Sequence, residues 1–288
     1  MSWLAYTAGA LAAAPDGGVF TNPLYWLGYL CLFLLEVATV LVNEVVDFRS
    51  DRENRFYSSF TGGSRVIVEG LLDKREMGIG IAAALAAMLA TTVGLVAVTP
   101  GSAPVALALL GVMSVLAIGY TAPPLKLSYR GLGEVDVALT HSLGMILCGF
   151  VFLGGCLLDP LPWLLSVPLL LSILPSITLA GIPDLEADAA AGKRTLAARF
   201  GQRRALWLAI AFVLIAVVAG VGWHILGLAG GAYAGVAWPA VPHALWLVWM
   251  LLRRIQAAPP PGRIDKLMVA SLAFILWFGL IPVLRLSG

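Results

Sequence analysis

The stretch LYWLGYLCLFLLEVATVLV, residues 24–42, runs directly into NEVVDFRSD, residues 43–51. The first part is apolar over about the 20 residues that a helix needs to cross the hydrocarbon core of a bilayer. The second part carries Asn43, Asp47 and Asp51 at intervals of four residues, so a helix continuing past the membrane would hold them on one face. The stretch therefore predicts a membrane-spanning helix that ends in a row of oxygen-bearing side chains.

The rest of the chain has the composition of an integral membrane protein. Of its 288 residues, 60% are hydrophobic and 12% are charged, whereas a soluble domain has about a quarter charged residues. The net charge of +2 gives no reason to expect a nucleic-acid partner. We therefore predict an all-α integral membrane protein in the lipid bilayer, with one polytopic domain over residues 1–288; its oligomeric state is not predicted.

Eight segments are long and apolar enough to span a bilayer. They cover residues 23–43, 77–98, 103–121, 133–155, 161–182, 205–226, 231–252 and 267–286. Residues 2–14 are also apolar, but as a helix they would reach only about 20 Å. We expect them to be half of a ninth helix, or a span whose start lies before Met1, which gives eight to nine transmembrane helices.

Basic residues lie on one side of this arrangement. The 18 Lys and Arg residues, except Arg285, all fall in alternate loops, at 49–75, 126–130, 193–204 and 253–266. The loops near residues 100, 159 and 228 hold none. Because basic loops stay in the cytoplasm, we expect a multi-pass protein of the cell (inner) membrane whose acidic motif faces the cytoplasm.

A second acidic motif, Asp184-Leu-Glu-Ala-Asp188, stands at the end of another apolar segment on the same predicted side. Its two aspartates follow Asp47 and Asp51 by the same 137 positions. Four predicted spans separate the motifs, which suggests two related four-helix halves that run in the same direction.

The two motifs together offer hard oxygen ligands from Asn43, Asp47, Asp51, Asp184 and Asp188. Mg²⁺ prefers such ligands, and it usually keeps several waters while it bridges to the phosphates of a substrate. The simpler alternative is that these carboxylates are solvated loop residues paired with nearby arginines. The presence of two matched copies favours the magnesium site.

Short basic phrases accompany the acidic motifs. They are TGGSR, residues 61–65, a proline-stiffened loop at 120–134, and GKRT, residues 192–195. The side chains that they supply are Arg65, Lys126, Arg130, Lys193 and Arg194. Cationic groups beside a metal are what a diphosphate requires, whether it is bound or leaving. The alternative role for these bases is contact with anionic lipid headgroups.

These motifs resemble the UbiA superfamily of intramembrane prenyltransferases, over nearly the whole chain. The likeness rests on Asn43-x₃-Asp47-x₃-Asp51, Gly62-Gly-Ser-Arg65, the 120–130 loop and Asp184-x₃-Asp188-x₃-Gly192-Lys-Arg-Thr-Leu. The phrases TGGSRV and GKRTLA are most similar to the menaquinone-pathway branch, which prenylates 1,4-dihydroxy-2-naphthoate. The stretch IPDLEAD, residues 182–188, is also similar to the homogentisate and chlorophyll-type branches.

The resemblance implies a nine-helix bundle around a central cavity that binds Mg²⁺ and a polyprenyl diphosphate. It gives the metal-binding and catalytic roles to the acidic motifs. The positions expected near the diphosphate are Arg65, Lys126, Arg130 and Lys193, together with Tyr120. Two features depart from the family pattern: the short first helix, and Ala180, one turn before Asp184, where relatives often have a polar residue.

The expected mechanism follows from this donor. Metal and bases would stabilise the charge on the departing diphosphate. Aromatic faces would hold the allylic cation until an electron-rich aromatic carbon attacks it. By position the candidates for these faces are Phe48, Tyr57, Phe60 and Tyr120.

Glu36 is a charged residue inside the first full span, seven residues before Asn43 and on the same face. A carboxylate within the membrane is costly and is by default a functional candidate. We interpret it as a substrate-binding residue that positions or deprotonates the acceptor hydroxyl; the alternative is a buried hydrogen bond to a neighbouring helix. His141 has the same two interpretations, and the buried hydrogen bond is favoured for it.

Three functions stay open from the sequence. The first is transfer of a polyprenyl group to an aromatic acceptor, and the second is a cyclase, or a transferase that uses another acceptor such as homogentisate, 4-hydroxybenzoate or a chlorophyllide-like ring. The third is transport. Transporters usually place charge near the bilayer midplane, whereas these carboxylates cluster at one end, so we favour the enzyme.

Overall fold

The computed structural model describes residues 1–14, 18–99 and 101–288. Within these ranges it consists of helices and one isolated β-bridge, between Ser58 and Thr61. The longer helices are α1 (Ser2–Ala13), α2 (Pro23–Val46), α4 (Lys74–Val98), α5 (Ala103–Gly119), α9 (Pro160–Ala191), α10 (Leu196–Ile225), α11 (Ala237–Ala257) and α12 (Asp265–Leu286). The shorter ones are η1 (Val19–Thr21), α3 (Phe48–Glu53), α6 (Leu127–Arg130), α7 (Gly133–Leu139), the π-helical η2 (Thr140–Gly144), α8 (Met145–Phe152) and η3 (Ala229–Gly231).

A helix lies over each segment predicted to be a span, which confirms the all-α membrane bundle. Six stretches of the described chain are long and apolar enough to cross a bilayer. They are α2, α4, the continuous rod α7–η2–α8, α9, α10 and α12. Helix α5 is apolar but shorter. The relation between two four-helix halves stays a prediction.

Two helix boundaries differ from the predicted ones. Helix α9 does not end at 182 but continues to Ala191, so the second acidic motif lies within its last turns and not in a loop. Helix α11 begins at Ala237, six residues later than predicted, because residues 227–235 form a glycine-rich turn. Gly227, Gly230, Gly231 and Gly235 there have positive φ angles, which helices do not accommodate.

Local sequence signals explain where the principal helices start and stop. Asn22 caps α2 by accepting a hydrogen bond from the Leu24 amide, and Pro23 takes the first helical position. Asp73 and Glu76 form a reciprocal capping box at the start of α4. Gly192 ends α9 in the left-handed conformation, with φ of 80°. This last turn aims the following residue back toward the helix that it ends.

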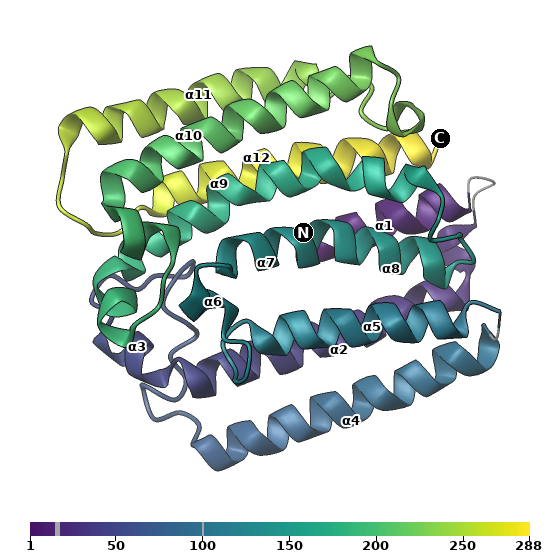
Figure 1. Ribbon diagram of the computed structural model, residues 1–288, viewed down its shortest axis with the longest axis horizontal. Coiled ribbons are helices and arrows are strands. Elements are labelled where there is room, and N and C mark those ends of the chain that lie inside the picture. Colours follow the sequence, from purple (N-terminus) through teal and green to yellow (C-terminus); the bar gives the residue numbers. More distant parts are fainter. Residues whose placement is uncertain (15–17, 100) are drawn as a thin grey trace.

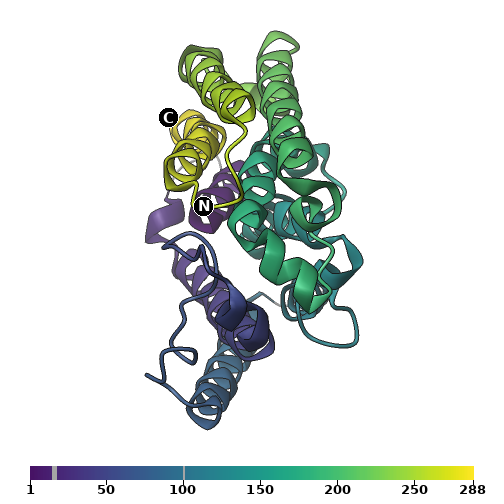
Figure 2. The ribbon, with the colours of Figure 1, turned by 90° about the vertical axis from the view of Figure 1, so that its left-hand side faces the viewer.

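Small residues allow two helices at the centre of the bundle to approach closely. A Cβ atom at Gly9 of α1 would collide with the backbone of Ile146, and one at Gly149 of α8 would collide with the backbone of Tyr6. Helices α1 and α8 therefore pack in backbone contact, as small residues allow between helices in membranes. Outside them lie α4 at one edge of the bundle and α10 and α11 at the other (Figures 1 and 2).

Both acidic motifs lie at the same end of the bundle. The first motif spans the junction of α2 and α3, and the second lies in the last turns of α9. Figure 1 shows this end on the left, beside α3 and α6. In the end view of Figure 2, the connection between α3 and α4 passes over this end. The fold thus brings two segments that are far apart in sequence to one site.

Candidate active site

The two acidic motifs face each other across a cavity of about 610 Å³. Its wall is formed by the ends of α2 and α9, by α3, and by the loop at 59–64. Of the residues predicted for the site, those in the wall are Asn43, Asp47, Asp51, Tyr120, Asp184, Asp188 and Lys193. Neighbouring carboxylates of Glu44 and Glu134 complete its charged lining.

The first motif stays helical through the junction of α2 and α3. The Asp47 amide donates to the Asn43 carbonyl at 2.8 Å, and the Asp51 amide donates to the Asp47 carbonyl at 2.9 Å. This unbroken ladder keeps the three side chains stacked on one face, as their spacing predicted. The Asn43 amide oxygen accepts a hydrogen bond from Thr121 Oγ1 at 2.6 Å and has a second lone pair to offer.

The glycine-rich loop lies directly against this motif. Gly62 and Gly63 have φ angles of 84° and 68°, which glycine adopts without strain. A Cβ atom at Gly63 would come within 2.9 Å of carboxylate oxygens of both Asp51 and Glu44. The Ser64 amide donates a hydrogen bond to Glu44. The two glycines therefore permit the close approach of the loop to the acidic motif.

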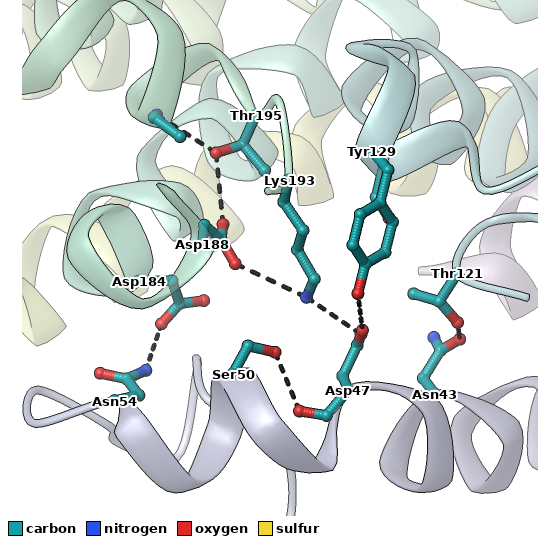
Figure 3. A network of polar contacts seen from close by, with 12 residues as sticks. Asn43, Asp47, Ser50, Asn54, Thr121, Tyr129, Asp184, Asp188, Lys193 and Thr195 are labelled. Atoms are coloured by element: carbon teal, nitrogen blue, oxygen red, sulfur yellow. Dashed lines mark hydrogen bonds and ion pairs between the residues drawn. The ribbon is translucent and has the colours of Figure 1, made fainter. Parts of the chain in front are cut away.

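Lys193 joins the two motifs (Figure 3). Its Nζ lies 3.1 Å from Asp47 Oδ2 and 3.5 Å from Asp188 Oδ1, with 10% of the side chain exposed. Burial disfavours the ammonium, but the charges of Asp47 and Asp188 outweigh it and raise the pKa of Lys193. The lysine stays charged and neutralises part of the negative charge between the motifs.

The remaining negative charge is large. The described lining contains six carboxylates, those of Glu44, Asp47, Asp51, Glu134, Asp184 and Asp188, and a single basic side chain. Burial, followed by the charge of Asp47, raises the pKa of Asp51 to about 7. Carboxylates gathered at this density are stabilised by a multivalent cation.

The donor set fits magnesium with additional ligands. Within the described residues, no three acidic, histidine or cysteine side chains converge closely enough to hold a metal ion by themselves. The aspartates stand instead as two pairs on opposite walls. Mg²⁺ usually takes only one or two carboxylates and fills its other positions with water and substrate phosphate. Paired carboxylates around a cavity this large match that requirement.

Several polar residues of the site could not be recognised from the sequence (Figure 3). Asn54 Nδ2 donates to Asp184 Oδ1 at 2.6 Å, so an amide next to the first motif holds an aspartate of the second. Thr195 Oγ1 lies 3.2 Å from Asp188 Oδ2 and also caps α10. The Tyr129 hydroxyl approaches Asp47 Oδ1 at 3.4 Å. Only the folding of the connecting loops brings these partners to the motifs.

The other predicted bases are not in the described wall of this cavity. Arg65 donates through Nη1 to the Asp51 carbonyl at 2.7 Å and stacks 3.8 Å above the Tyr57 ring. Lys126 lies over the ring of Tyr129. Arg130 is exposed and donates to the Pro124 carbonyl, and Arg194 is exposed. Arg65 is thus one contact away from the cavity wall, and Lys126 is two contacts away, through Tyr129 and Asp47. Arg130 and Arg194 lie on the surface.

Glu36 lines a second cavity, of about 420 Å³, on the bundle side of the first. The two cavities share Val40, Asn43 and Tyr120 as common wall. The Glu36 carboxylate accepts a hydrogen bond from Ser2 and lies 3.5 Å from His141 Nδ1. The hydrogen bond of the second sequence alternative is therefore present, and the functional role of Glu36 stays a prediction.

The fold and this site define a polytopic membrane protein with an acidic cavity at one end of its bundle. The chain belongs to the UbiA prenyltransferase family, which matches residues 2–281. The family resemblance and the prediction of a prenyltransferase are thereby confirmed.

Two curated relatives indicate the range of the family around this chain. It is 27% identical over 250 residues to the digeranylgeranylglyceryl phosphate synthase of Natronomonas pharaonis, covering 83% of this chain and 82% of that one. It is 28% identical over 205 residues to the 1,4-dihydroxy-2-naphthoate octaprenyltransferase of Bacillus subtilis, covering 70% of this chain and 62% of that one.

Solved structures agree with the fold. A UbiA homologue from Archaeoglobus fulgidus, bound to GPP and Mg²⁺, superposes with a TM-score of 0.68 at 16% identity, covering 97% of this chain and 94% of that one. The apo structure of a UbiA homologue from Aeropyrum pernix K1 gives a TM-score of 0.68 at 20% identity, covering 99% and 97%. At these identities the likeness establishes the architecture of the bundle.

Proposed function

We propose that this chain transfers a polyprenyl group, with Mg²⁺, from a polyprenyl diphosphate to 1,4-dihydroxy-2-naphthoate as the aromatic acceptor. The observation that carries the proposal is the meeting of two carboxylate pairs across one cavity, with Lys193 between them. The Archaeoglobus fulgidus homologue bound to GPP and Mg²⁺ supports the donor and the ion. The Bacillus subtilis relative supports the acceptor.

The residues that would hold the ion are those of the two motifs: Asn43, Asp47, Asp51, Asp184 and Asp188. Magnesium, when bound, supplies positive charge that stabilises the diphosphate as it leaves. Asn54 and Thr195 orient the aspartates from outside, in the way that second partners orient metal ligands.

The diphosphate would be held by Lys193 in the cavity and by the bases around it. Lys193 donates through its ammonium, which already lies among the carboxylates. Arg65 and Lys126 contact residues of the wall or beside it, whereas Arg130 and Arg194 are exposed. We expect these four bases to approach a bound diphosphate when their loops fold over it.

The allylic cation left by diphosphate departure needs an aromatic and dry surrounding. Tyr120 and Phe60 line the cavity and are placed to provide it. Tyr57 stacks on Arg65, and Phe48 lies beneath Lys74, so these two rings are already engaged. Tyr120, which borders both cavities, stands where the donor and acceptor would meet.

A second acceptor is favoured by one specific observation. The relative from Natronomonas pharaonis aligns with more of this chain than the Bacillus enzyme does, and its name indicates a glyceryl phosphate product. The same cavity would ionise the donor for either acceptor. The alternative function is therefore transfer to a glycerol-phosphate lipid hydroxyl.

An acceptor panel tests the proposal. Purified protein is incubated with Mg²⁺ and radiolabelled polyprenyl diphosphates of several lengths. The acceptors offered one at a time are 1,4-dihydroxy-2-naphthoate, homogentisate, 4-hydroxybenzoate and geranylgeranylglyceryl phosphate. We expect diphosphate release and a prenylated naphthalene product that both require Mg²⁺. Turnover confined to the glyceryl phosphate would support the alternative, and no release with any acceptor would overturn both.

We also propose that the protein lies in the cell membrane with the acidic cavity on the cytoplasmic side. The support is the confinement of all Lys and Arg residues except Arg285 to the loops at that end. A water-soluble diphosphate donor head would then enter from the cytoplasm.

A further inference from the structure

The second cavity differs from the first in chemical character. Most of its wall is apolar and comes from α2, α5 and the rod α7–η2–α8. Its polar groups at the far end from the shared wall are Glu36 and His141, and Asp136 comes from the first turn of α7. Among the side chains that the structure describes there, none is a lysine or an arginine. This cavity is therefore built to accept hydrogen bonds rather than to hold an anion.

Glu36 and His141 form a coupled pair at this cavity. His141 Nδ1 lies 3.5 Å from Glu36 Oε1 and 2.9 Å from the Ser2 hydroxyl. The side chains stay partly accessible, at 38% for His141 and 32% for Glu36. His141 belongs to the π-helical turn η2, a feature that occurs frequently at functional sites. An imidazole beside a carboxylate is a competent proton acceptor.

Asp136 gives an independent sign of a ligand. Only 5% of the surface of Asp136 is exposed. Its Oδ1 atom has no hydrogen-bond partner among the described residues, although it lines the cavity. A buried carboxylate oxygen without a partner is costly, and a donor hydroxyl placed in the cavity would satisfy it.

From this geometry we infer that the second cavity binds the acceptor through its hydroxyl groups, which donate to Asp136 and to the Glu36–His141 pair. This inference rests on the proposed prenyl transfer. An apolar wall with Met113 and Met145 suits an aromatic ring. A carboxylate on that ring points away from Asp136 and Glu36, toward the shared wall and Lys193. The second cavity therefore selects for hydroxyl groups and not for the acid group.

The proposed step transfers the prenyl group from the diphosphate oxygen to a ring carbon of the acceptor. The C–O bond between the isoprenoid C1 and the diphosphate breaks, and its electron pair leaves with the diphosphate. The acceptor hydroxyl gives its proton to His141, while a ring electron pair forms the new C–C bond to C1. Glu36 stabilises the imidazolium. The ring ketone so formed regains its aromaticity when the ring proton at the new bond leaves with the diphosphate and the imidazolium returns its proton to the oxygen.

Steady-state kinetics with three conservative variants tests the inference. Glu36→Gln, His141→Asn and Asp136→Asn are assayed at saturating donor and Mg²⁺, with 1,4-dihydroxy-2-naphthoate and with naphthalene-1,4-diol. We expect the KM for both acceptors to rise about tenfold or more in Asp136→Asn. We expect kcat to fall by about a hundredfold in His141→Asn. The donor KM stays within about twofold of wild type, as expected when one substrate's contacts are removed.

Controls separate this role from a structural one. His243→Asn removes another partly buried histidine, which is bonded to Trp277 and to the Ala270 carbonyl far from both cavities. It is expected to lower thermal stability and leave the acceptor KM unchanged. The dimethyl ether of the naphthalenediol lacks both hydroxyl donors, so the three variants should bind it with the same affinity as wild type. Retained Mg²⁺-dependent binding of labelled donor shows that each variant is folded.

The kinetic results distinguish an acceptor site in the second cavity from an isoprenoid site there. A change in donor KM or in preferred chain length, with an unchanged acceptor KM, would assign the second cavity to the isoprenoid and overturn the inference, while prenyl transfer stands. A wild-type protein without turnover would refute the proposed function. In that case equilibrium binding of naphthalene-1,4-diol decides: binding that is lost in Asp136→Asn supports the inference, and no wild-type binding overturns it.

Discussion

At the scale of single residues, the site depends on an ammonium group that is buried among carboxylates. Lys193 neutralises Asp47 and Asp188 together, and it is the described link between α2 and the end of α9 at this point. Removing one member of a buried ion pair leaves an uncompensated charge, which costs several kcal/mol. In the proposed function the same ammonium meets the diphosphate, so stability and catalysis would share one side chain.

Substitution Lys193→Met should therefore have two effects. Without Mg²⁺, the free energy of unfolding falls by about 3 kcal/mol because the aspartates lose their buried partner, and the melting temperature falls with it. Added Mg²⁺ restores part of the lost stability, because the bound ion then neutralises the negative charge of the carboxylates. Scanning calorimetry of wild type, Lys193→Met and Lys266→Met, an exposed control in the first turn of α12, measures this. Equal Mg²⁺ responses in all three proteins would contradict the role given to Lys193.

Asn54 offers a narrower prediction, because it acts on Asp184 and not on the ion. Removing a partner that orients a metal ligand typically costs 10–100-fold in metal affinity. We expect Asn54→Ala to raise the Mg²⁺ concentration for half-maximal turnover by about tenfold. Asn22→Ser, a change at the α2 cap on the other end of the bundle, serves as control. An unchanged Mg²⁺ requirement in Asn54→Ala would remove Asn54 from the site.

The sequence predicted the core of the site because its spacing is local. Asn43, Asp47 and Asp51 lie on consecutive turns, and one helix suffices to align them. Asn54, Tyr129 and Thr195 act through side-chain bonds from loops or neighbouring turns that depend on the tertiary structure. Their spacing along the chain carries no such signal. The bases Arg130 and Arg194 show the reverse: the motif identifies them, but the fold leaves them on the surface.

At the scale of helices, backbone contact between α1 and α8 holds α1 beside two residues of the second cavity, Glu36 and His141. Gly9 and Gly149 permit this contact, and both positions are blocked by backbone atoms of the other helix. Ser2 of α1 reaches Glu36 and His141 because of this packing. Helix α1 is thus part of the site as well as of the bundle.

A pair of alanine substitutions tests this contact. Gly149→Ala forces α1 and α8 apart and should cost about 1–3 kcal/mol of stability, as overpacking does. Gly111→Ala, on α5, adds the same methyl group where no atom lies within 4 Å. It should leave the melting temperature unchanged or raise it slightly. Equal melting temperatures for both variants would show that the helices do not meet as described.

Hydropathy located the helices more reliably than it located their ends. It places a span where apolar residues run, and the predicted centre of each helix was correct. It missed the continuation of α9 through Asp184 to Ala191, since a helix needs no apolar residues once it has left the membrane. It also began the span of α11 at residue 231, six residues early, because residues 231–236 are largely apolar although Gly231 and Gly235 adopt positive φ.

At the scale of the whole molecule, charge is divided between the two ends. One end carries the acidic cavity and the basic segments at 49–75, 126–130, 193–204 and 253–266. Of the Lys and Arg residues, Arg285 alone lies at the other end. This asymmetry orients a membrane protein with its basic end in the cytoplasm. In the orientation that we propose, the cavity would open toward the compartment from which a charged donor arrives.

The native cysteines offer a direct test of this orientation. Cys156 is exposed in the loop between α8 and α9, whereas Cys31 and Cys148 are buried. A membrane-impermeant maleimide should label Cys156 in intact cells or spheroplasts. Gly70→Cys, made with Cys156→Ser, places a thiol in the open loop at the other end. It should react only after permeabilisation, and the opposite pattern would reverse the topology.

The most direct test of the central claim is Mg²⁺-dependent diphosphate release by Asp47→Ala and Asp184→Ala, measured with labelled polyprenyl diphosphate and the preferred acceptor. Asp159→Asn, a change at the opposite end of α9 where an asparagine still caps the helix, is the matched control. If the two motifs share one site, each alanine variant loses about a hundredfold or more in turnover while it stays folded, and the control stays active. Wild-type turnover in either folded alanine variant would contradict the account.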